Sequence, residues 1–210
     1  MKCLNRLEPI ENIFVNVEYD LLRVYFEENG FWVRQDQTYS ETGKKGSVFP
    51  FFEILRASNS SEDVDGSFRL FTGDLTRFNS AIVSQFGWQD TGFSADMLSS
   101  DVRLMKFYRK NVESLKTAWE TVKTSILLKE KKFILILPAL PKSENKTSEL
   151  FNSLRTNEVQ GVLTMSSVLE NLLRKSSGKV ETRGNSTFHL LKLLRVYGLA
   201  TEPQLGIFDQ

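Results

Sequence analysis

Carboxylates carry most of the chemistry that this sequence offers. Among its 210 residues there are one Cys, Cys3, and one His, His189. A zinc site of Cys and His ligands, a Cys–His catalytic pair and an internal disulfide are therefore excluded. Asp74 follows an apolar stretch at 68–71, where the pattern changes from strand-like to helical, and Glu53 lies inside another apolar stretch. The remaining chemistry must come from carboxylates such as these, from Lys and Arg, and from hydroxyls.

Each of these two acids also has a purely structural interpretation. Asp is common at helix N-caps, so Asp74 can cap a helix that begins with the next residue. Pro50 favours an edge position or a bulge for the stretch that contains Glu53. That acid can then be an exposed side chain of an edge strand, paired with Arg56 or Arg69. The residues alone leave both interpretations open.

Basic side chains are concentrated in the second half of the chain. Residues 1–100 carry 9 basic and 15 acidic side chains and residues 101–210 carry 18 and 11, although the net charge is only +1. A basic half can meet phosphates. Cations alternate with aromatic residues near the middle of the chain, a pattern that suits base stacking and phosphate contact. We predict four nucleic-acid-binding residues there: Arg103, Lys106, Arg109 and Lys110. The alternative is that the aromatic residues fix a helix onto a sheet while the cations are solvated.

Several function classes lack their signature. The sequence contains no Walker A, G-x-G-x-x-G or G-x-S-x-G pattern, so phosphate-loop NTPases, dinucleotide enzymes and α/β-hydrolases lose their main support. The first residues lack the apolar core of a signal peptide, and no stretch of about 18 apolar residues occurs. We therefore expect a cytoplasmic protein without a membrane partner.

The periodicity of apolar residues predicts the elements that position these side chains. Helices are expected at 11–29, 75–87, 101–128, 144–156, 166–176 and 186–197. Strands are expected at 31–39, 47–57, 67–73, 132–138 and 159–165. The continuously apolar run at 132–138 is typical of a strand buried on both faces. The last helix, which contains His189, can close the core or serve as the recognition helix of a small helix-turn-helix unit. The expected fold class is α/β.

An opening helix, three meandering strands, a helix and a buried strand resemble the restriction-endonuclease-like core, the PD-(D/E)XK nuclease superfamily. The resemblance covers residues 11–165, including a helical insertion at 88–128, and leaves 166–210 as a helical tail packed on the core. It implies a mixed sheet flanked by helices. It further implies a Mg²⁺ site, with a Lys two residues beyond the second strand acid that helps to activate water.

The resemblance assigns roles to residues by position. Glu18 or Asp20 would be the helix acid, Glu53 the acid of the second strand and Asp74 that of the third, while Gln85 would contribute from the following helix. The implied metal ligands are thus Glu18, Glu53 and Asp74, and the implied catalytic residues are Glu53, Asp74 and Gln85.

The sequence departs from the superfamily pattern at the catalytic lysine. No Lys occurs between Gly46 and Met105, and Thr76 stands two residues after Asp74. Arg56 or Arg77 is a poor replacement, because Arg stays protonated in proteins. We therefore expect a domain that binds DNA or RNA without efficient cleavage. The alternatives are an active Mg²⁺-dependent nuclease and a protein-interaction scaffold that binds no nucleic acid. A homodimer is possible.

Overall fold

The computed structural model of the chain describes residues 17–35, 51–56, 66–88, 91–125, 132–176 and 186–200. The side chains of Gln35 and of residues 121–125 are not described. The elements follow in the order α1 (Val17–Glu28), β1 (Phe31–Gln35), β2 (Phe51–Arg56), the 3-10 helix η2 (Thr72–Arg77), β3 (Ser80–Gln85), α2 (Ala95–Leu98), α3 (Asp101–Ser125), β4 (Lys132–Leu137), α4 (Glu144–Thr156), β5 (Gly161–Thr164), α5 (Met165–Lys175) and α6 (Ser186–Val196).

The described strands form one mixed sheet with the order β1-β2-β3-β4-β5. The first three strands are antiparallel neighbours, and the register sets Arg34 opposite Glu53 and Glu53 opposite Ile82. β4 is parallel to β3, and β5 is parallel to β4. The expected α/β class is confirmed. The expected edge position of the strand that carries Glu53 is wrong, because β2 lies between β1 and β3.

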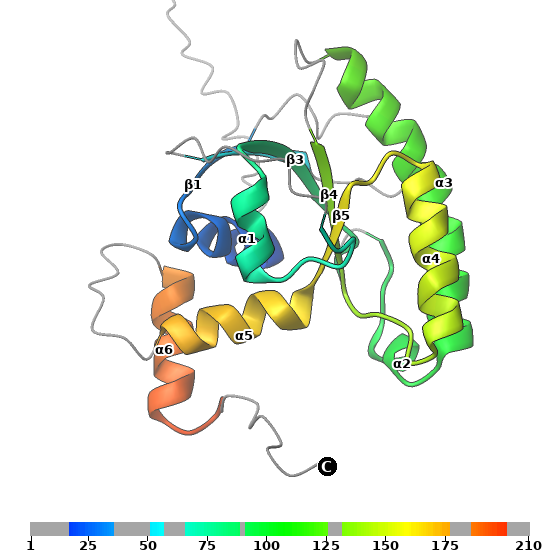
Figure 1. The fold of residues 1–210 in the computed structure, drawn as a ribbon. Helices are drawn as coiled ribbons and strands as arrows, with labels where there is room; N and C mark the ends of the chain where they lie inside the picture. The colour runs from blue at the N-terminus through cyan, green and yellow to red at the C-terminus, as the bar shows by residue number, and fades with distance from the viewer. Residues whose placement is uncertain are drawn as a thin grey trace, which may run out of the picture.

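Helices cover the sheet on both faces (Figure 1). α3 and α4 connect the parallel strands and lie on one face, and α1, α5 and α6 lie on the other. Parallel strands need crossover connections of this kind, because the chain must return to the starting edge before it can run in the same direction again.

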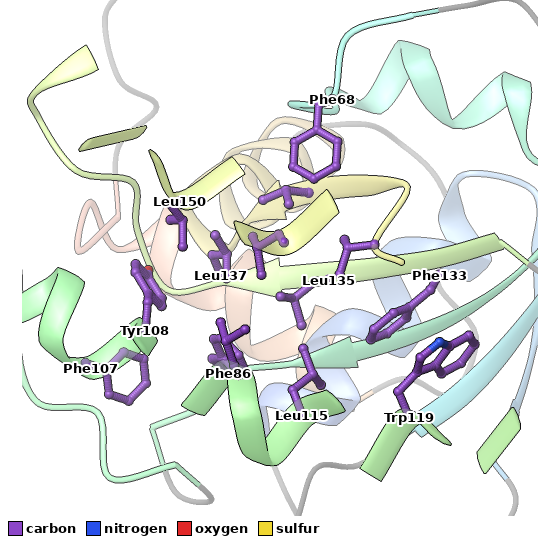
Figure 2. Close-up of a cluster of buried hydrophobic side chains, with 14 of the residues drawn as sticks. Phe68, Phe86, Phe107, Tyr108, Leu115, Trp119, Phe133, Leu135, Leu137 and Leu150 are labelled. Carbon is purple, nitrogen blue, oxygen red and sulfur yellow. The ribbon is translucent and has the colours of Figure 1, made fainter. Parts of the chain in front are cut away.

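The core under α3 and α4 is rich in aromatic side chains, which Figure 2 shows. At one end the Trp119 and Phe133 rings stack with centroids 4.4 Å apart. At the other end Phe86 stacks on Tyr108 at 6.0 Å, and the Tyr108 hydroxyl donates to the Ala139 carbonyl. Burial raises the pKa of Tyr108. The hydroxyl therefore stays a hydrogen-bond donor that ties α3 to the chain after β4.

The core on the other face is formed mainly by α1, α5 and α6 against the sheet. Leu22, Tyr25 and Phe26 of α1 are fully buried there, as the spacing of apolar residues in this helix predicts. Phe188 and Leu191 bring α6 into the same core. Lys175 at the end of α5 donates to the Glu28 carbonyl at the end of α1. The C-terminal helices therefore belong to the packed body of the protein.

The third strand of the meander is the main correction to the sequence prediction. We expected a strand at 67–73 and a helix at 75–87, but the strand beside β2 is β3, Ser80–Gln85. The expected strand lies at the opposite edge of the sheet, where Arg69 forms an isolated parallel bridge with Val162 of β5. Leu70 N donates to Val162 O at 2.7 Å, and Val162 N donates to Phe68 O at 2.9 Å.

Close packing holds this displaced segment in place. A Cβ atom added to Gly161 would lie 2.4 Å from Leu70 Cδ1, so the glycine permits Leu70 to press directly onto β5. The chain then turns through η2, where Thr72 Oγ1 lies 3.1 Å from Tyr25 Oη, and returns to begin β3. Extended local conformation was therefore predicted correctly for 68–70, and its partner strand was not.

The remaining elements agree with the sequence prediction. β4 is buried along Phe133–Leu137, as expected for an apolar run covered on both faces. α4, β5, α5 and α6 lie within a few residues of their expected positions, and α3 begins at Asp101 as expected. The expected start of the first helix, at 11–16, and the expected end of the long helix, at 126–128, lie outside the described residues.

Candidate functional site

The candidate site lies at the end of the sheet where the parallel strands finish. β3, β4 and β5 run in the same direction, so their last residues lie at the same end of the sheet. Ligands of open α/β sheets usually bind outside the carboxyl ends of the strands. The first turn of α1 reaches the same end, because Glu18 contacts the residues that follow β3.

Glu18 is held against the end of β3 by the backbone. Its Oε2 accepts a hydrogen bond of 2.9 Å from Trp88 N. A Cβ atom added to Gly87 would lie 2.6 Å from this oxygen and 3.2 Å from Gln85 Nε2. The carboxylate and the amide therefore meet over Gly87, which has no side chain to separate them. Glu18 and Gln85 are the two predicted site residues that the structure brings together.

Gln85 is the most unusual polar side chain of this site. It is only 1% exposed, and neither Oε1 nor Nε2 has a hydrogen-bond partner in the described part of the chain. A buried polar group without a partner costs about 1–3 kcal/mol. Stability therefore does not explain an amide at this position. Gln85 was expected on a helix and instead ends β3.

The turn after β3 is fixed by local contacts. Thr91 Oγ1 donates to Gly87 O at 2.5 Å, and the Trp88 and Phe93 rings meet edge to face with centroids 4.8 Å apart. Trp88 stays partly exposed beside the carboxylate. The turn therefore places the Trp88 ring and its backbone N–H beside the carboxylate of Glu18 and the buried amide of Gln85.

Glu53 does not reach this site. Successive side chains of a strand point to opposite faces. Phe52 and Ile54 belong to the core under α1, whereas Phe51 belongs to the core under α3. Glu53 therefore lies on the α3 face of the sheet, and Glu18 belongs to the helix on the other face.

Asp74 also has a different position from the one expected. It lies in η2 rather than at a strand end, and its Oδ2 accepts a hydrogen bond of 2.8 Å from Phe71 N. Asp74 therefore takes part in a local cap, as one interpretation of the sequence expected. It does so as the third residue of η2, and not as the N-cap of a helix at 75–87. η2 contacts α1 at Tyr25, which is about 10 Å along the helix axis from Glu18.

The implied magnesium site is not formed by these residues. Across the described ranges, no three or more His, Cys, Asp or Glu side chains are grouped so that they could hold a metal ion. Mg²⁺ needs several oxygen ligands in near-octahedral geometry. Glu18 lies on the α1 side of the sheet, Glu53 lies on the α3 side and Asp74 lies in η2. Asp20 does not complete a group of three with any of them.

The predicted nucleic-acid-binding cations all lie on the exposed side of α3, while Leu104, Phe107 and Tyr108 face the core. Three of the cations follow one line along the helix with the spacing i, i+3 and i+7: Arg103, Lys106 and Lys110. The fourth differs, because Arg109 Nη2 forms an ion pair of 2.6 Å with Glu149 Oε1 of α4. We call Arg103, Lys106 and Lys110 the basic stripe.

Asp101 fixes the start of α3, and with it the basic stripe, to the start of α4. Its two carboxylate oxygens accept hydrogen bonds of 2.8 Å from Lys142 N and 2.9 Å from Ser143 N. These hydrogen bonds lower the pKa of Asp101, with a smaller contribution from the charge of Lys146. The carboxylate is therefore ionised at neutral pH and joins the two helices.

Comparison of the chain with protein-family models, with curated proteins and with solved structures finds no match in any of the three. None of the described helices has both the length and the apolar character needed to cross a membrane.

Sequence reasoning missed two parts of the site, Gly87 and the backbone N–H of Trp88. Gly87 was interpreted as the end of a helix. The apolar run Ala81–Val83 could have identified a buried strand, since such runs are ambiguous between helix and strand. With that strand assigned, Gly87 would have become the first residue beyond a strand end at which a close approach is possible.

Proposed function

We propose that this chain binds nucleic acid through the basic stripe of α3 and does not cleave it. The observation that carries the proposal is the alignment of Arg103, Lys106 and Lys110 on one exposed line of α3, whose opposite side is buried in the core. From Arg103 to Lys110 the line spans about 10 Å along the helix axis. Cations arranged in this way contact successive phosphates without reading the bases.

The residues at the end of β3 support binding without cleavage. In the superfamily that the sequence resembles, the third strand supplies an acid and a Lys two residues later. The third strand of this meander ends at Gln85, and Gly87 is two residues beyond it. An amide and a glycine stand where an acid and an ammonium group would be needed, and Glu53 lies on the other face.

The element order supports the same superfamily as the source of the fold. The resemblance implies an opening helix, three meandering strands, a helix and a buried strand, and the described chain has these elements in this order, with the buried strand β4 parallel to β3. This support concerns architecture alone, because one fold serves many functions. The proposed binding therefore depends on the basic stripe and is tested there.

The test compares two charge reversals on the same helix. Lys106→Glu changes the stripe, whereas Lys116→Glu changes an exposed residue on a different side of α3. Affinity for labelled single-stranded DNA, double-stranded DNA and RNA is measured over a range of salt concentrations. We expect affinity to fall steeply with salt, and Lys106→Glu to reduce the salt slope by about 1. Lys116→Glu should leave both quantities unchanged.

Two results would overturn the proposal. Negligible binding at low salt, or equal effects of the two reversals, would exclude the basic stripe as the binding surface. Nicking of plasmid DNA in the presence of Mg²⁺ that is lost in Glu18→Gln would contradict the absence of cleavage.

A further inference from the structure

The outer face of α6 is the exposed surface that the proposed function does not use. α6 is firmly attached, because Phe188 and Leu191 are buried against α1 and α5 and Arg195 Nη1 donates to Leu173 O at 2.6 Å. These contacts fix which side of the helix faces outward. The exposure of that side is therefore a property of the packed fold.

The outward side is mainly apolar, with Ser186 and His189 as exposed polar residues within it. Leu190, Leu193, Val196 and Tyr197 lie within one face of about 120° on a helix of 3.6 residues per turn. Leu193 is 40% exposed and Tyr197 is 75% exposed, with the other two between these values. Leu199, also 75% exposed, follows directly and is held by its N–H to Leu194 O at 2.8 Å. We call these five residues the α6 patch.

An apolar patch of this kind marks an interaction site. The outward side of a surface helix is normally polar. Contiguous apolar surface on a soluble domain usually serves binding. α4 has the usual pattern, since its outward residues include Asn145, Glu149 and Asn152, all exposed. The α6 patch is therefore an exception within the same molecule.

Within the described residues of α6, the charged side chains are positive. α6 contains no acidic residue, and Lys192 lies exposed one turn before Val196 of the patch. Arg174, at the end of the neighbouring α5, is exposed as well. A partner that buries the patch must therefore tolerate or match positive charge at its border.

We propose that the α6 patch binds an amphipathic helix of another protein whose apolar residues are flanked by acidic ones. The spacing of Leu190, Leu193 and Tyr197 matches the i, i+3 and i+7 anchors by which helices dock against one another. Acidic flanks would meet Lys192, whereas a second copy of this chain would place like charges against it. A membrane surface is less well matched, because the apolar face is only a few turns long and stable anchoring needs more than one such signal.

The test uses two synthetic helical peptides with identical Leu positions. One carries Glu and the other carries Lys at the flanking positions. The fluorescence anisotropy of each labelled peptide is followed as the full chain is added. We expect the Glu peptide to bind at least about tenfold more tightly than the Lys peptide. Hydrogen exchange should slow within residues 186–200 when the Glu peptide is bound.

Variants assign the binding to the patch. Leu193→Ser and Tyr197→Ser should each weaken the Glu peptide by about tenfold. Trp32→Ser is the matched control, because Trp32 is 71% exposed on β1, far from α6 in sequence, and should have no effect. Lys192→Glu should reverse the preference between the two peptides. Circular dichroism confirms that each variant is folded.

Four outcomes would overturn this proposal. They are equal binding of both peptides, binding of neither, binding only to vesicles that contain phosphatidylserine, and a dimer in sedimentation that Leu193→Ser dissociates. The proposal is independent of the proposed nucleic-acid binding. Leu193→Ser should leave affinity for nucleic acid unchanged, and Lys106→Glu should leave affinity for the peptide unchanged.

Discussion

The two faces of the sheet are built differently. Under α3 and α4, a continuous set of aromatic and aliphatic side chains is buried, and the outward side of α4 is polar. On the other face, α1, α5 and α6 also bury a large core. That face nevertheless holds Gln85, a buried amide with no hydrogen-bond partner in the described part of the chain, and the α6 patch, an exposed and mainly apolar surface.

The α3 face of the sheet therefore buries a continuous set of apolar groups, whereas the α1 face also holds a buried amide and an exposed apolar surface. A buried unpaired amide and an exposed apolar surface both carry a cost that binding can remove. On the α3 side the corresponding surface feature is the basic stripe, which water already solvates well. We therefore expect substitutions on the α3 side of the core to lower stability most, a substitution that removes the amide of Gln85 to raise it, and substitutions in the α6 patch to affect recognition.

The largest expected effect is the loss of an aromatic ring from the α3 core. Phe133 is fully buried between Trp119, 4.4 Å away between ring centroids, and Phe51, 5.9 Å away. Phe133→Ala should lower the free energy of unfolding by about 3–5 kcal/mol. Leu193→Ala removes apolar volume from the α6 patch and should change it by less than about 0.5 kcal/mol. Denaturant unfolding of both variants measures the contrast, and similar costs would erase the distinction between the two regions.

A smaller effect is expected where Glu18 meets Gly87. In Gly87→Ala the new Cβ would displace the carboxylate from Trp88 N, at a cost of about 1 kcal/mol for the lost hydrogen bond, which is exposed and involves the end of a flexible side chain. The cost should shrink in a Glu18→Ala background, and a double-mutant cycle measures this coupling.

Gly73→Ala is the matched control for the preceding substitution. A Cβ atom added to Gly73 meets nothing within 4 Å. Its effect on stability should stay within about 0.5 kcal/mol. Equal costs at both glycines, or additive costs in the cycle, would show that Glu18 is not seated over Gly87.

Gln85→Met tests the unpaired amide and should raise the free energy of unfolding, whereas Phe133→Ala and Gly87→Ala should lower it. Met has a similar length and no group that needs a hydrogen bond, so the variant should be more stable by about 1 kcal/mol. The free energy of unfolding of the isolated chain is the measurement. A loss of stability would mean that the amide is already hydrogen bonded in solution, and the site would then no longer differ from an ordinary core position.

The smallest expected effect is the pH dependence of the link between α3 and α4. The pKa of Asp101 is lowered in the folded chain from an ordinary value of 3.8. Its contribution to stability is therefore complete above that value, and it is lost as the pH falls through the lower folded pKa. Asp101→Asn should lower the melting temperature slightly at neutral pH and should match the parent protein at strongly acidic pH. A difference that persists in acid would assign the effect to packing.

Most helices and the two parallel strands after α3 were predictable from the sequence. Long amphipathic patterns and the apolar run of β4 depend on burial alone, which periodicity reports directly. The third strand was not predictable in this way. Ala81–Val83 reads equally well as strand or helix, and only the neighbouring β2 and β4 decide between them. The stretch at 68–71 has the composition of a strand, but its partner, β5, is about 90 residues away in the sequence.

The candidate site was predictable only in part. Glu18 and Gln85 were among the predicted residues, and the structure brings them together at Gly87. Asp74 was assigned to the third strand, and the error in that strand moved it away from the site, whereas Glu53 lies on the expected second strand but on the other face of the sheet. The face to which a strand side chain points depends on register, and register is set by tertiary pairing.

The segment at 68–70 has a consequence for how molecules of this protein meet one another. Its hydrogen bonds occupy both backbone groups of Val162, so β5 does not offer a bare edge there. At this end of the described strand order, edge-to-edge pairing with another molecule would first have to detach Leu70 from Gly161. The segment therefore protects β5 as a covering strand protects a sheet edge.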